Sequence, residues 1–154
     1  MTKFWIAAAA GALLSGPAFA SAHLGPGDPA AGEEIFNQCQ SCHNIVDDEG
    51  EVIAGRPNVR TGPNLYNVVG RQAGTVEGFR YRPDIVAAGE QGLVWDAEGL
   101  TAYLQDPGGF LSETLDKNAR SGMAYRLRTE EDAQNMAAYL ATHSPQAEEG
   151  EATN

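Results

Sequence analysis

The stretch Cys39-Gln40-Ser41-Cys42-His43 decides the fold of this chain. Two thiols separated by two residues and followed directly by a histidine form the attachment pattern of c-type haem. Because the thiols lie about one helical turn apart, they can bond to the two vinyl groups on one porphyrin edge, and the next imidazole is carried under the iron. The pattern predicts one covalently bound haem c per chain, attached through Cys39 and Cys42, with His43 as an iron ligand.

Other chemistries also use closely spaced cysteines. A thiol-disulfide oxidoreductase carries C-x-x-C at the start of a helix, whereas this pair follows a predicted helix and no βαβ pattern precedes it. A zinc site needs further ligands, and His23 and His143 both lie near the ends of the mature chain. A plain disulfide is the third alternative. Haem attachment is the favoured interpretation.

The iron needs a sixth ligand if it is to be closed to other molecules. After the first 22 residues only Met123 and Met136 offer a thioether. Met136 falls on the apolar stripe of a predicted helix, which favours a core position. Met123 lies in an aperiodic segment and is the predicted ligand. If Met123 did not bind, the protein would be a haem peroxidase or a gas sensor with an open site.

The N-terminus is typical of a secretory signal peptide. Lys3 is followed by a short apolar run, and small residues at Ala18, Ala20 and Ala22 provide two cleavage motifs. We expect cleavage after Ala20 or Ala22 and a mature protein in the periplasm. A membrane anchor is the alternative, but the run is shorter than the ~20 apolar residues that span a bilayer, so no anchor is expected.

Length and charge limit what the mature protein can be. A chain of 154 residues suits one domain, which we expect to be a monomer. The net charge of -11 excludes nucleic acid as a partner class, because phosphates would be repelled. The predicted parts are a signal peptide (1–22), a folded domain (23–143) and a mobile acidic tail (144–154).

Helical patterns predict the secondary structure, and no strand is expected. Asp28, Asp96 and Thr129 are placed as N-caps. Pro107 is expected to end the third helix, and residues 44–61 to form a polar loop. The predicted helices run from Pro29 to about Cys39, over 83–89, over 97–106, and from Thr129 through an apolar stripe of Ala133, Met136, Ala137 and Leu140.

The order of further motifs resembles the class I cytochromes c, specifically the larger bacterial cytochrome c2 branch. The resemblance runs from about Gly27 to Ser144. The matching motifs are Gly32 with Phe36, Cys39 to His43, Thr61-Gly62-Pro63-Asn64-Leu65, Gly70-Arg71, Gly78-Phe79-Arg80-Tyr81, Trp95, Tyr103, Met123 and Ala138-Tyr139-Leu140.

The resemblance implies an all-α class I cytochrome c fold with crossed N- and C-terminal helices around one haem, and Gly32 letting them approach near Tyr139. It also implies a one-electron carrier and not an enzyme. The donor would be a quinol-oxidising membrane cytochrome complex. The acceptor would be a terminal oxidase, a photosynthetic reaction centre or a periplasmic reductase.

The resemblance also assigns roles near the iron. Pro63 would accept a hydrogen bond from the His43 ring, and Tyr103 would hydrogen-bond near the Met123 sulfur. The haem propionates would be held by Arg71, Tyr81 and Trp95.

One feature departs from the family, whose members commonly ring the exposed haem edge with lysines. The only lysine after the signal is Lys117; the other cations near Met123 are Arg120, Arg126 and Arg128. We expect this basic cluster to steer an acidic partner towards the haem edge. The alternative is that these cations only offset propionates and nearby acids.

Overall fold

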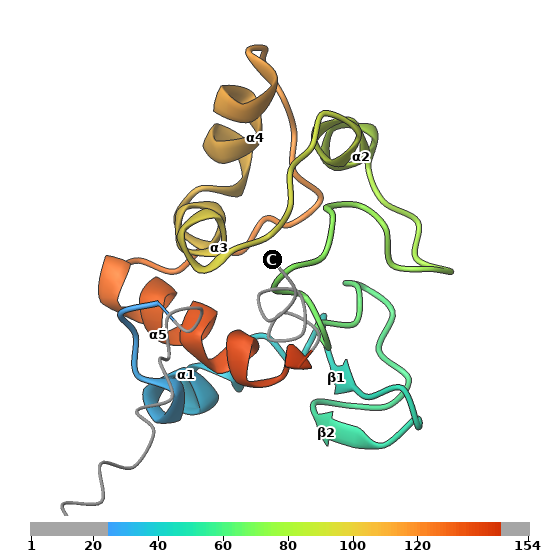
Figure 1. Cartoon of the computed structure of the whole chain (residues 1–154), viewed down its shortest axis with the longest axis vertical. Helices are drawn as coiled ribbons and strands as arrows, with labels where there is room; N and C mark the ends of the chain where they lie inside the picture. The colour runs from blue at the N-terminus through green and yellow to red at the C-terminus, as the bar shows by residue number, and fades with distance from the viewer. Residues whose placement is uncertain (1–24, 146–154) are drawn as a thin grey trace, which may run out of the picture.

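The computed structural model describes residues 25–145, and within them five helices and a small sheet. Figure 1 shows α1 and α5 together at one end, α2 and α4 at the other, α3 between α4 and α5, and the β-hairpin at one side. The predicted all-α class is confirmed, with the hairpin as an addition. The elements are α1 Pro29–Phe36, β1 Ile45–Val46, β2 Val52–Ala54, α2 Pro83–Glu90, α3 Ala97–Gln105, α4 Pro107–Leu115 and α5 Glu130–Thr142.

Helices α1 and α5 pack closely against each other, as the resemblance implied. The Asp28 backbone N–H donates to Asn135 Oδ1 at 2.7 Å, which ties the start of α1 to α5. A Cβ atom at Gly32 would overlap the Asn135 carbonyl and lie 2.6 Å from Tyr139 Cβ. Beside this contact the rings of Phe36 and Tyr139 stand 5.5 Å apart. The predicted close approach at Gly32 is therefore confirmed.

Helix α1 ends at Phe36, three residues before the predicted end. The amides of Gln38 and Cys39 bond three residues back, to Ile35 and Phe36, at 3.0 and 2.8 Å. Such bonds tighten the last turn and stop α-helical propagation. The chain continues as turns through the cysteine pair, where the His43 amide reaches the Cys39 carbonyl at 2.9 Å.

The hairpin contradicts the prediction that residues 44–61 form a loop without strands. Ile45 pairs with Ala54 in the antiparallel sheet and is fully buried. At the turn, Asp47 Oδ1 accepts the amides of Glu49 and Glu51 at 3.1 and 2.7 Å. Strands of two and three residues are too short to show an alternating pattern in the sequence.

Helix α4 was also missed, since Pro107 was expected only to end α3. Proline lacks an amide hydrogen, so it ends one helix but is well suited to be the first residue of the next. Pro107 does both here: α3 ends at Gln105 and Pro107 begins α4. Gly108 and Gly109 follow, and their low helix propensity hid the helix in the sequence.

Helices α2, α3 and α5 begin where they were predicted, and the apolar stripe of α5 is buried. Ser144 is fully buried as well: its Oγ accepts the Val69 amide at 3.1 Å and donates to the Leu140 carbonyl at 2.9 Å. The packed structure therefore includes Ser144, one residue beyond the predicted domain. The predicted signal peptide and residues 146–154 of the tail lie outside the described part. Within residues 25–145, no helix has both the length and the apolarity to cross a bilayer.

Candidate functional site

The His43 ring is held in one tautomer by Pro63. Its Nδ1 lies 2.9 Å from the Pro63 carbonyl oxygen. Because a carbonyl oxygen can only accept, Nδ1 carries the ring hydrogen and the lone pair is on Nε2. Burial lowers the pKa of the imidazole, and the hydrogen bond to Pro63 opposes that shift. The ring is therefore neutral at neutral pH, which is the form that binds a metal through Nε2.

Gly62 makes room for this arrangement. A Cβ atom there would lie 2.6 Å from Nδ1 and 2.7 Å from Nε2 of His43. The Gly62 amide also donates to the Cys42 carbonyl at 2.7 Å. The 61–65 segment is thus attached to the cysteine motif at two points, and any larger residue at position 62 would displace the imidazole.

The environment of Cys39 and Cys42 argues against thiol-disulfide chemistry. Both side chains are half-buried and no disulfide joins them. Burial, with a smaller contribution from the charge of Cys42, raises the pKa of the Cys39 thiol to about 11. Redox-active thiols have a lowered pKa, because the thiolate is the nucleophile. The raised pKa of Cys39 therefore does not favour disulfide exchange.

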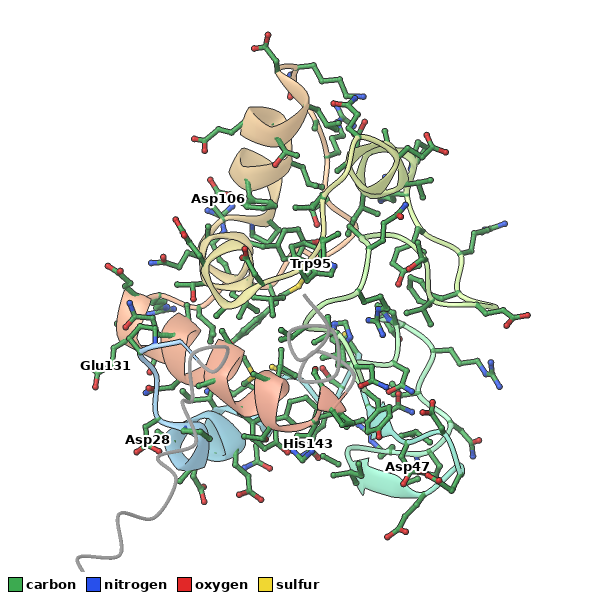
Figure 2. All side chains as sticks on the ribbon, viewed as in Figure 1. Asp28, Asp47, Trp95, Asp106, Glu131 and His143 are labelled. Carbon is green, nitrogen blue, oxygen red and sulfur yellow. The ribbon has the colours of Figure 1, made fainter. Side chains whose placement is uncertain are left out.

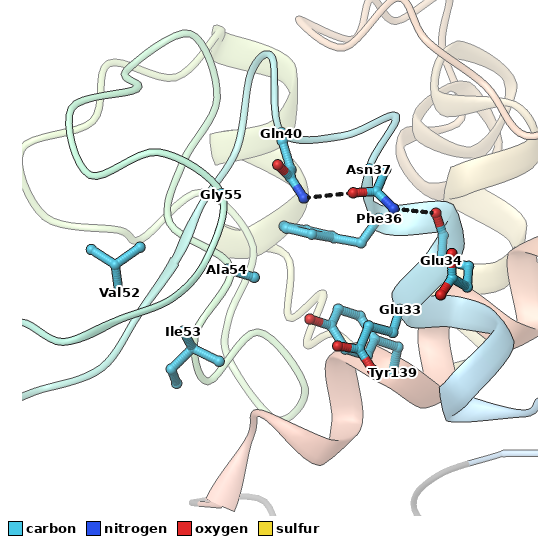
Figure 3. A pocket seen from close by; sticks show the side chains of 10 residues that line it. All are labelled: Glu33, Glu34, Phe36, Asn37, Gln40, Val52, Ile53, Ala54, Gly55 and Tyr139. Atoms are coloured by element: carbon cyan, nitrogen blue, oxygen red, sulfur yellow. Dashed lines mark hydrogen bonds between the residues drawn. The ribbon is translucent and has the colours of Figure 1, made fainter.

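The cysteine motif is also braced against the end of α1. Gln40 Nε2 donates to Asn37 Oδ1 at 3.1 Å, and Asn37 Nδ2 donates to the Glu34 carbonyl at 3.0 Å (Figure 3). These residues line a surface hollow of about 360 Å³ between α1, β2 and α5, which also includes Ile53 and Tyr139. None of the predicted site residues lines this hollow.

Of the three residues expected to hold the propionates, Arg71 lies near each of the other two. The Trp95 amide donates to the Arg71 carbonyl at 3.0 Å, and the charge of Arg71 opposes the rise that burial causes in the Tyr81 pKa. The Arg71 guanidinium donates to the carbonyls of Tyr66 and Asn64 at 2.8 and 3.1 Å. Two of its five N–H groups are used there, which leaves donors for an anion.

An aromatic cluster connects this group to the segment that carries Met123. Figure 2 shows Trp95 near the middle of the molecule, and its ring lies 5.0 Å from that of Tyr103. The Tyr103 hydroxyl and Ser121 Oγ are 2.7 Å apart, and Ser121 Oγ accepts the Met123 amide at 3.0 Å. Tyr103 thus reaches Met123 through Ser121, a residue to which the sequence had assigned no role.

The two methionines lie in different environments. Met123 is partly buried and packs against the core from a segment without regular structure. Met136 is 1% exposed within α5, so its predicted position in the core is confirmed.

The basic cluster is only partly neutralised. Lys117 Nζ lies 2.7 Å from Asp84, and Arg126 lies 3.6 Å from Asp106, whose place at the edge of the molecule is labelled in Figure 2. Arg120 and Arg128 are exposed, and within residues 25–145 their guanidinium groups make no ion pair. The charge of Arg120 also helps to lower the pKa of Asp84, so among the described residues Arg128 is the member of the cluster without a recorded acidic neighbour.

The donors in the described residues fit a haem c group. They comprise two half-buried thiols that no disulfide joins, an imidazole with its lone pair on Nε2, and a partly buried thioether. In cytochromes c, two cysteines attach the porphyrin, while a histidine and a methionine hold the iron.

Known proteins with similar sequences are bacterial cytochromes, most of them named cytochrome c2. The chain is 52% identical over 117 residues to cytochrome c2 of Rhodovulum adriaticum, covering 75% of this chain and 92% of that protein. It is 54% identical over 116 residues to cytochrome c2 of Cereibacter sphaeroides, covering 74% and 93%. Cytochrome c-551 of Roseobacter denitrificans is 56% identical over 119 residues, covering 77% and 82%. No protein-family model matches the chain.

Solved structures agree with the sequence comparisons. Cytochrome c2 from Rhodobacter sphaeroides superposes with a TM-score of 0.73 at 52% identity, covering 77% of this chain and 97% of that one. Cytochrome c2 from Paracoccus denitrificans also gives 0.73, at 37% identity, covering 79% and 99%. The chain therefore belongs to the cytochrome c2 family, whose members are electron-transfer proteins with one covalently bound haem c.

Proposed function

We propose that the mature protein is a periplasmic one-electron carrier whose iron is held by His43 and Met123. The observation that carries the proposal is the His43 ring, which hydrogen-bonds to Pro63 through Nδ1 and lies beside a cysteine pair without a disulfide. This arrangement presents Nε2 to a group attached through Cys39 and Cys42.

The haem supplies reversible one-electron chemistry, and the chain sets its conditions. The Pro63 carbonyl keeps the His43 imidazole in one tautomer and orientation. Met123 would be the second residue to bind the iron and would keep small molecules from it. Its soft thioether favours the ferrous state and so raises the reduction potential. Burial within the domain disfavours the additional positive charge of the ferric state.

The residues around the iron have separate roles. We assign Arg71, Tyr81 and Trp95 to the propionates. The assignment is supported by the nearness of Arg71 to each of the other two and by its unused guanidinium donors. Tyr103 positions the Met123 segment through its hydrogen bond with Ser121.

The physiological partners follow from the class of carrier. A quinol-oxidising membrane cytochrome complex is proposed as the donor, and a terminal oxidase, a photosynthetic reaction centre or a periplasmic reductase as the acceptor. The predicted signal peptide supports a periplasmic location for these reactions. Detection of a mature chain beginning at Ser21 or His23 in the periplasmic fraction would test it.

A potentiometric titration of the purified protein tests this function. We expect the visible absorbance to follow a one-electron curve, with about 59 mV per tenfold change in the reduced-to-oxidised ratio. A colourless protein with a two-electron slope of about 30 mV would instead identify a dithiol-disulfide couple and contradict the proposal.

Steering by the basic cluster gives a second prediction. Replacing Arg120 or Arg128 with glutamine, one at a time, should lower the rate constant for reduction by an acidic redox partner at low salt and flatten its dependence on ionic strength. Both side chains are exposed, and within residues 25–145 neither guanidinium makes an ion pair. Stopped-flow measurements between 10 mM and 500 mM salt would show it.

Arg126→Gln is the matched control, since Arg126 already faces Asp106. It should change the salt dependence less than either of the other substitutions. Equal effects of all three variants, or no salt dependence in the unmodified protein, would contradict the steering role.

A further inference from the structure

The segment from Lys117 to Met123 has no helix or strand of its own and depends on its neighbours for its position. It begins after α4, where Asp116 adopts a left-handed φ of 49°. The Ala119 amide donates to Ser112 Oγ on α4 at 3.1 Å. The Tyr103 hydroxyl on α3 contacts Ser121, as described above. Both of these contacts come from side-chain hydroxyl groups of α3 and α4.

A third attachment comes from α2, through Asp84. One carboxylate oxygen, Oδ2, accepts the Arg120 backbone amide at 2.8 Å, and the other, Oδ1, lies 2.7 Å from Lys117 Nζ. The hydrogen bond from Lys117 is the largest cause of the lowered Asp84 pKa, followed by the bond from the Arg120 amide. Both oxygens of one carboxylate thus bind the same short segment at points three residues apart.

Asp84 is well supported in this position. It lies in the first turn of α2, where a carboxylate is favoured by the helix dipole. The side chain of Arg82, the residue before α2, lies alongside Gly122. A Cβ atom at Gly122 would stand 3.6 Å from the Cγ and Cδ atoms of Arg82. The N-terminal end of α2 therefore contacts the segment at Arg120 and at Gly122, the residue before Met123.

We propose that Asp84 is a positioning residue that keeps Met123 on the iron. The inference rests on the proposed function, in which Met123 is the sixth ligand. Movement of the segment that would carry Met123 away from the iron breaks the two charge-assisted contacts of Asp84, so these contacts oppose it. Their loss shifts the balance between the bound and the displaced thioether.

Imidazole competition on the ferric holoprotein measures that balance, because added imidazole binds only where the thioether has left. We expect Asp84→Ala to increase the apparent imidazole affinity about tenfold and to speed hydrogen exchange at the Arg120 amide. Lys117→Gln removes only one contact and should give an increase of about threefold. The far-red absorbance of the iron-sulfur bond reports displacement in each case.

Asp106→Ala is the control. Asp106 also pairs with a cation near Met123, but that cation is Arg126, which follows Met123 in the sequence, and the contact of 3.6 Å joins two side chains. It should leave imidazole affinity unchanged. If Asp84→Ala does not fold, Lys117→Gln decides alone. Unchanged imidazole affinity and amide exchange in the Asp84 and Lys117 variants would overturn the positioning role. Failure of Met123 ligation itself would be seen separately, as no far-red band in the unmodified protein.

Discussion

Replacing Met123 with alanine is expected to lower the reduction potential by about 0.2 V, within the roughly 0.8 V that axial ligands control in haem proteins. The soft thioether favours the ferrous state, and water or no ligand would replace it. The ferric far-red band should disappear and carbon monoxide should bind to the reduced protein. Potentiometry and visible spectra of the holoprotein check these results.

Met136→Leu is the matched control, since Met136 is buried in α5 and a leucine of similar volume fits a core position. Its potential and spectrum should equal those of the unmodified protein. If instead the Met123 variant kept its potential and the Met136 variant lost the far-red band, the ligand assignment would have to be exchanged.

Replacing Gly32 with alanine is expected to destabilise the protein by about 2 kcal/mol or more. The added methyl group would overlap the Asn135 carbonyl and lie 2.6 Å from Tyr139 Cβ, so α1 and α5 must move apart. Overpacking of this kind costs about 1 to 3 kcal/mol, and separation of the helices also loses the contact of Phe36 with Tyr139. Denaturant unfolding, followed by circular dichroism, measures the free energy.

Gly108→Ala provides the comparison. Gly108 also lies in a helix, but a Cβ atom there would meet nothing within 4 Å. Alanine should therefore leave stability unchanged or raise it by up to about 1 kcal/mol, through its better helix propensity. A similar loss in both variants would mean that close approach at Gly32 is not what makes glycine necessary there.

The sequence predicted the parts of the fold that local chemistry determines. Asp28, Asp96 and Thr129 accept amide hydrogens at the starts of α1, α3 and α5, as their side chains and positions indicated. The hairpin and α4 escaped prediction for different reasons. Ile45 is buried in a strand that is too short to show an alternating pattern. Pro107 follows the end of α3 and also begins α4, and a proline looks the same in the sequence in either role.

The site was predictable where a motif names its residues, and less so where contacts come from distant segments. Pro63 lies where the resemblance placed it, with its carbonyl at the His43 ring. Asp84 and Ser121 were not assigned roles, because Asp84 meets Arg120 across 36 positions and Ser121 meets Tyr103 across 18. Single polar residues give no sequence signal for such long-range partners.

The central claim is a closed haem with His43 and Met123 as iron ligands. A reduced-minus-oxidised visible spectrum of protein expressed in a periplasm, recorded with and without carbon monoxide, tests it most directly. The account predicts sharp c-type bands that carbon monoxide does not change, together with the weak far-red band in the ferric form. A spectrum shifted by carbon monoxide would contradict the closed site, and absence of haem absorbance would contradict the attachment at Cys39 and Cys42.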